Sequence, residues 1–133
     1  MGRFRIDRLT PPPGLLLGED GAVLAARCYR ATALGARLVG LLATADLAPD
    51  EALWLEPCAS VHALGLRAPI GCAFLDGGGT VLRVLDPLPR NRLAAVRGAR
   101  AVVECHAGRL GDLAPGARLV WSPPRDGRWP RRS

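Results

Sequence analysis

The chain has no lysine, and all 18 of its basic residues are arginine. Alanine, glycine, proline and leucine are abundant, so this usage is more consistent with a GC-rich coding genome than with selection for phosphate contacts. Residues 1–8 and 123–133 hold seven Arg against two Asp, a net charge of +5, and residues 9–122 add only +1. No recognisable nucleic-acid motif or aromatic-lined basic face is present. Binding of nucleic acid or an acidic partner through the Arg-rich tails is therefore only our third interpretation.

Long apolar runs are also missing. The run Leu15-Leu16-Leu17 is far shorter than the roughly 7–15 apolar residues of a signal peptide. No stretch approaches the roughly 18 apolar residues of a membrane span. We therefore expect a cytoplasmic protein with reduced thiols and no contact with a membrane.

The four cysteines, at positions 28, 58, 72 and 105, form no Cys-x-x-Cys pair. Structural zinc sites usually take paired ligands at short spacing. Cys105 and His106 are adjacent, so their side chains should point to opposite faces of a strand. We therefore expect no metal and no cofactor, and we interpret most of the thiols as core residues.

With 133 residues and a hydrophobic fraction of 49%, the chain has the size and composition of one globular domain. We expect a flexible arm at 1–14, one domain at 15–121 and a basic, disordered tail at 122–133. Leucines at helical spacing after Thr32 predict one main helix near residues 31–43. The predicted fold class is therefore α+β, with a compact, mostly antiparallel, curved or barrel-like sheet.

Two apolar runs, Ile70–Leu75 and Thr80–Leu85, flank the turn Asp76-Gly77-Gly78-Gly79. This pattern predicts a β-hairpin in which Asp76 caps the turn. The triple glycine does not favour a phosphate loop, because a strand and not a helix follows it. Further strands are expected at Ala101–Cys105 and Arg118–Trp121. Glu104 should face solvent or pair with an arginine such as Arg67.

An ordered series of short motifs runs through most of the chain. The pieces are Arg37-x-x-Gly40-Leu41-Leu42, Leu53-Trp54-Leu55-x-Pro57-Cys58-x-Ser60-Val61-His62, Gly65-x-Arg67-x-Pro69-Ile70, Phe74-Leu75-Asp76-x-x-Gly79-x-Val81, Val102-Val103-Glu104-x-x-Ala107-Gly108 and Pro115-Gly116. Over residues 20–121 this series resembles the uncharacterised bacterial and archaeal family called domain of unknown function 192. The resemblance implies a barrel-like sheet with a packed helix, and it implies no established reaction.

The chain departs from the family pattern at Ala63, Leu66, Ala68 and Gly71. The family usually has a hydroxyl, a thioether, an aromatic ring and a carboxylate at these places. Gly71 matters most, because an acid beside the imidazole of His62 would be missing from any family site.

Cys58, His62 and Arg67 form the densest group of reactive side chains. A cysteine nucleophile needs a neighbouring base, and Cys58 with His62 supplies those residue types. On extended backbone the two would stand about 13 Å apart, and only a turn would bring them together. Arg67 is suited to bind carboxylate or phosphate, and Arg90 and Arg92 are weaker candidates on a neighbouring loop.

We therefore expect a non-enzymatic binding or accessory module that recognises a small anionic ligand or a partner segment near His62 and Arg67. The alternative is a small enzyme that uses Cys58 and His62.

Overall fold

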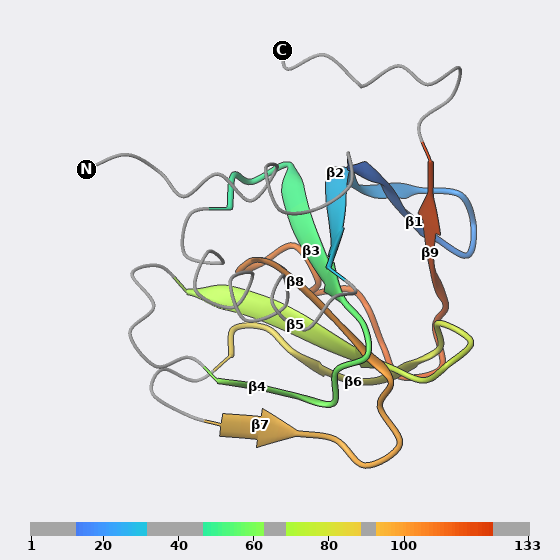
Figure 1. The fold of residues 1–133 in the computed structure, drawn as a ribbon. Coiled ribbons are helices and arrows are strands. Elements are labelled where there is room, and N and C mark those ends of the chain that lie inside the picture. The colour runs from blue at the N-terminus through green and yellow to red at the C-terminus, as the bar shows by residue number, and fades with distance from the viewer. Residues whose placement is uncertain (1–12, 32–46, 63–68, 89–92, 124–133) are drawn as a thin grey trace.

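The computed structural model of the chain describes residues 13–31, 47–62, 69–88 and 93–123 (Figure 1). Nine strands occur in these ranges. They are β1 (Gly14–Gly18), β2 (Val23–Ala31), β3 (Glu51–Leu55), β4 (Ser60–His62), β5 (Ile70–Leu75), β6 (Val81–Leu85), β7 (Leu93–Ala95), β8 (Ala101–His106) and β9 (Leu119–Ser122).

Seven strands form one sheet in the order β6-β5-β8-β3-β2-β1-β9, and β4 pairs with β7 in a separate two-stranded sheet. Neighbours in the large sheet are antiparallel except for β2 and β3, which are parallel. Figure 1 shows that the large sheet curls, so that β9 and the β5–β6 hairpin approach one another.

The two edges of the large sheet meet at a single β-bridge between Thr80 and Arg118. Backbone hydrogen bonds on either side reinforce it: the Leu119 N–H donates to the Gly79 carbonyl at 2.9 Å, and the Val81 N–H donates to the Ala117 carbonyl at 2.7 Å. Gly79 has a φ of +87°, and a Cβ there would lie 2.6 Å from the Leu119 oxygen. Only glycine lets the two edges come this close. The result is a half-barrel closed at one point, which we call the seam.

Alternation along the strands gives the sheet two faces. The inner face carries small and aliphatic side chains that fill the half-barrel, including Cys28, Ala52, Ala73, Val103 and Cys105. The next residues along the same strands form the outer face. Ile70, Cys72, Phe74 and Val102 pack there with Val61 of β4, and Tyr29 packs with Leu47, Leu53 and Leu55. Both faces are therefore buried, as the continuous burial of β3 and β5 requires.

The α+β prediction is wrong for the residues that the structure describes, because they contain strands and no helix. The helix predicted near 31–43 falls almost wholly in residues 32–46, outside the described ranges, and Ala31 is the last residue of β2. The described core is built instead from apolar strand segments such as β3 and β5, which are buried along their whole length. The barrel-like sheet itself is confirmed.

The predicted hairpin is confirmed as β5 and β6. Asp76 caps its turn, since Asp76 Oδ1 accepts the N–H groups of Gly78 and Thr80 at 2.9 Å each. The predicted strands near 101–105 and 118–121 correspond to β8 and β9. In the described part of the chain, no helix is long and apolar enough to cross a bilayer.

Candidate functional site

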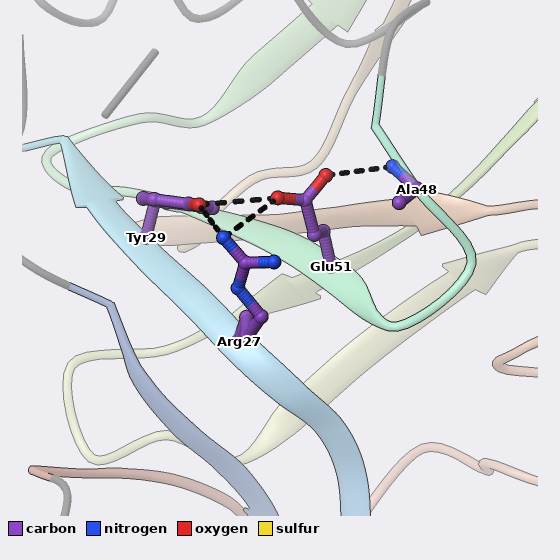
Figure 2. Close-up of polar contacts among 4 residues, drawn as sticks. All are labelled: Arg27, Tyr29, Ala48 and Glu51. Carbon is purple, nitrogen blue, oxygen red and sulfur yellow. Dashed lines mark hydrogen bonds and ion pairs between the residues drawn. The ribbon is translucent and has the colours of Figure 1, made fainter. Parts of the chain in front are cut away.

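A polar cluster lies on the outer face where β2 and β3 run parallel (Figure 2). Tyr29 donates its hydroxyl proton to Glu51 Oε2 at 3.1 Å and accepts a hydrogen bond from Arg27 Nη2 at 3.0 Å. Glu51 Oε1 accepts the Ala48 N–H at 2.8 Å, and Arg27 Nη2 stands 3.7 Å from Glu51 Oε2. Each oxygen of this buried carboxylate is therefore bound. Burial first, and the Glu51 charge second, raise the pKa of Tyr29. The cluster pins the parallel pair together.

Glu104 lies on the same face at the centre of β8, and its environment differs. Its cross-strand neighbours are Leu53 on β3 and Cys72 on β5. The residue is only 1% exposed, and neither carboxylate oxygen has a hydrogen-bond partner among the described residues. Burial raises the pKa of the Glu104 carboxyl to about 8. The expectation that Glu104 faces solvent is therefore wrong. The alternative, pairing with an arginine such as Arg67, concerns a residue outside the described ranges.

The buried cysteines are poor nucleophiles. Desolvation is the main cause that raises the pKa of Cys72 and of Cys105 to about 12, and it raises the pKa of Cys28 further. Because the thiolate is the reactive form, these three thiols are held in an inert state. Their assignment to the core is confirmed. Among the described residues, no three His, Cys, Asp or Glu side chains gather as metal ligands.

Cys58 is half-buried just before β4. Its thiol donates to the Ser60 carbonyl at 3.1 Å, and its backbone N–H donates to the Arg100 carbonyl at 2.9 Å. His62 is the last residue of β4, where it pairs with Leu93; its side chain is not among those described. The distance between the thiol and the imidazole, on which an enzyme would depend, therefore stays a prediction.

Of the other predicted site residues, Arg67, Arg90 and Arg92 lie outside the described residues. His106 and Cys105 are adjacent in the sequence. His106 lies on the outer face of β8, and Cys105 lies on the inner face. The His106 ring nitrogen Nε2 contacts the Leu47 carbonyl. Because a carbonyl only accepts, Nε2 carries the proton.

Gly71, where the family resemblance implies an acid, packs against the carboxylate of Asp86, the residue that follows β6. A Cβ at position 71 would lie 2.7 Å from Asp86 Oδ1. The Asp86 oxygens accept the N–H groups of Gly108 and Leu110 at 2.7 and 2.8 Å. A carboxylate, that of Asp86, therefore lies beside position 71. It binds the loop after β8.

An open cleft of about 230 Å³ lies beside the seam, lined in part by Arg30, Arg118, Trp121 and the glycines 77–79. Arg30 stacks on Trp121, with its guanidinium carbon 4.9 Å from the ring centroid. The Arg30 Nε is buried and has no hydrogen-bond partner in the described part of the chain. Arg118 donates from Nε to the Gly78 carbonyl at 3.1 Å. The described lining has two guanidinium groups and no acid, a composition suited to an anionic group.

Trp121 is fixed in place by contacts with β1 and β2. Its indole N–H donates to the Cys28 carbonyl at 2.9 Å, across 93 residues of sequence. The residues of this cleft were missed by the sequence analysis, because Arg30 and Trp121 meet only once β9 has joined β1. The glycine turn was the one sequence feature that belongs to the cleft. We interpreted it only as the turn of a hairpin, and its contact with the cleft was not predicted.

A second cleft, of about 520 Å³, is lined by Glu19, Asp20 and Asp112 as well as Arg109 and Arg118. Acids and arginines mix on its rim, so it has less preference for a ligand of one charge.

The fold and the cleft define a small half-barrel β domain with an arginine-lined recess at its seam. The profile of DUF192, described as "Uncharacterized ACR", matches residues 17–121. The chain belongs to this family, as its motifs indicated.

Two crystal structures share the fold. One is a protein from Sinorhizobium meliloti 1021, provisionally named a transcription regulator, with 19% identity and a TM-score of 0.67 over 83% of this chain and 92% of that one. The other is a protein of unknown function from Novosphingobium aromaticivorans DSM 12444, with 18% identity and a TM-score of 0.67 over 91% of this chain and 100% of that one. At this identity the likeness shows the fold alone. No curated protein matches the chain.

Proposed function

We propose that this domain is a non-enzymatic binding module for a small anionic ligand or the anionic end of a partner, and that the cleft at the seam is its recognition site. The observation that carries the proposal is the pair of guanidinium groups, from Arg30 and Arg118, in a lining without a described acid. Guanidinium groups bind carboxylate and phosphate in a planar, two-pronged geometry.

The state of Arg30 supports this role. Its Nε is out of contact with water and has no described acceptor. A buried donor without an acceptor costs about 1–3 kcal/mol. Because water does not reach Nε, an oxyanion in the cleft would meet the Nη atoms of Arg30, whose charge no acid of the described lining compensates. The stacking of Arg30 on Trp121 holds the guanidinium in position beforehand, which reduces the entropy lost on binding.

His62 and Arg67 are a second candidate position for the anion. His62 ends a strand that packs, through Val61, on the outer face of the large sheet, and Arg67 follows five residues later. β4 contributes no residue to the described lining of the cleft, so mutation can separate the two candidates.

Small anions at matched ionic strength test the proposal through the thermal midpoint. We would compare phosphate, sulfate and citrate with chloride on wild type, Arg30→Gln, Arg67→Gln and the control Arg83→Gln, which replaces an exposed arginine of β6. An anion at ten times its Kd should stabilise wild type by about 1.4 kcal/mol. Arg30→Gln should abolish this gain, and Arg83→Gln should keep it.

A gain lost only in Arg67→Gln would move the site to the His62–Arg67 segment. No gain with any anion in wild type would overturn the proposed function.

Neither alternative function gains support from the described residues. The Cys58 thiol donates to the Ser60 carbonyl, and the His62 side chain that an enzyme would pair with it is not among those described. The Arg-rich tails lie almost entirely outside the described ranges, and the regulator name belongs to a relative of 19% identity.

A further inference from the structure

The cleft forms where the chain turns away from the free edge of β9. Thr80 and Arg118 pair at the seam, and the residues before Thr80 would continue alongside β9 if the strand ran straight. Instead the chain enters the turn Asp76–Gly79 and returns into β5. Beyond Leu119, β9 therefore has no described neighbour on its seam side.

The peptide groups of Trp121 point toward this gap. In an antiparallel sheet, the N–H and C=O of one residue point to the same side, and the next residue points to the other. The Leu119 N–H points to the seam, because it donates to the Gly79 carbonyl. Trp121, two residues later, points the same way. Val120, between them, is 40% exposed. The edge thus offers one donor and one acceptor, with an apolar side chain beside them.

The guanidinium groups of the cleft lie where the C-terminus of an added strand would be. A segment that fills the gap continues the line of β6 backwards from Thr80, antiparallel to β9. Its C-terminus then meets the glycine turn and Arg118, whose Nε is anchored on the Gly78 carbonyl. The remaining guanidinium nitrogens of Arg118, and those of Arg30, stay as donors for a terminal carboxylate. In the parallel direction the carboxylate would lie at the Ser122 end, away from the turn.

We infer that the cleft at the seam binds the C-terminal carboxylate of an extended polypeptide segment that adds to β9 as an antiparallel strand. This inference rests on the proposed function and names its ligand. It combines two known modes of peptide recognition, strand addition at an open edge and capture of a chain terminus by a turn. The volume of about 230 Å³ holds the last residue or two of such a segment, and the rest would lie along the edge.

The test is amide chemical-shift mapping of the full chain with a synthetic hexapeptide of alternating valine and threonine. The free-acid peptide should shift the amides of Gly77, Gly78 and Trp121. The same peptide with a C-terminal amide should bind about tenfold more weakly, because the arginines lose their anion. N-methylation of the residue opposite Trp121 should weaken binding by a similar factor, and Arg83→Gln should bind like wild type.

The outcomes separate the two proposals. Phosphate or citrate binding that depends on Arg30, without any shift from the free-acid peptide, would leave the anion site standing and overturn the peptide assignment. Equal affinity of the acid and amide peptides would also overturn it. If neither small anions nor peptide bind, both proposals fail. Competition between citrate and the free-acid peptide for the same amides is the result that we expect.

Discussion

Glu51 and Glu104 are two buried glutamates on one face of the same sheet, 2% and 1% exposed, and their surroundings are opposite. Both oxygens of Glu51 are bound, by Tyr29 and the Ala48 N–H, with Arg27 close by. Neither oxygen of Glu104 has a described partner. Burial alone therefore does not tell what an acid contributes. A bound carboxylate holds two strands together, and an unbound one is retained at a cost in stability.

The largest expected effect is a pH dependence that the Glu104 carboxyl produces. The folded protein keeps this proton up to a pKa of about 8, whereas the ordinary value is 4.5. Between those values folding takes up a proton, so the free energy of unfolding falls as pH rises, by at most about 1.4 kcal/mol per pH unit. Urea titrations from pH 5 to 8 on wild type and Glu104→Gln measure it, and the variant should lack this component. Equal slopes in the two proteins would show that Glu104 is ionised in the folded state.

The next effect concerns Glu51. Glu51→Leu keeps the approximate volume but leaves Arg27, Tyr29 and the Ala48 N–H without their acceptor. We expect the free energy of unfolding at pH 7 to fall by about 3 kcal/mol, as for other broken buried pairs. Urea unfolding measures the loss, with the exposed Glu19→Leu as control. A loss near that of the control would mean that the cluster contributes nothing to pairing of β2 with β3.

The smallest effect has the opposite sign. Glu104→Leu, the same substitution on the neighbouring strand β8, removes a buried carboxyl that lacks described partners. We expect the free energy of unfolding at pH 7 to rise by roughly 2 kcal/mol, because replacing an unpaired polar group with an apolar one is favourable. The measurement is the same urea titration as for Glu51→Leu. If both leucine variants lose stability equally, the contrast between the two glutamates is wrong.

The sequence predicted the parts of the fold that depend on local signals. The hairpin at β5 and β6 follows from glycines between two apolar runs, and Asp76 caps its turn through its own short side chain. The strands near 101 and 119 follow from short apolar runs beside the turns Ala107-Gly108 and Pro115-Gly116, and the ordered motifs identified the family. These features need only residues that are close in sequence.

Features that need distant residues could not be predicted. The burial of Glu104 depends on β8 lying between β3 and β5. Arg30 and Trp121 come together only through the pairing of β1 with both β2 and β9. The parallel pairing of β2 with β3 was not predicted either, although it brings Glu51 to Tyr29. A charged residue between two apolar ones in a strand normally indicates a solvent-facing side, and here it does not.

The pairing of β1 with β9 also decides when the protein can finish folding during synthesis. β1 ends at Gly18 and its partner begins at Leu119, so the ribosome must add about a hundred residues before the outer edge of β1 is covered. Until then the nascent chain displays an open strand of leucines, which is the kind of edge that other chains can join. Factors that hold nascent chains should therefore matter most for this protein in the interval before its last strand emerges.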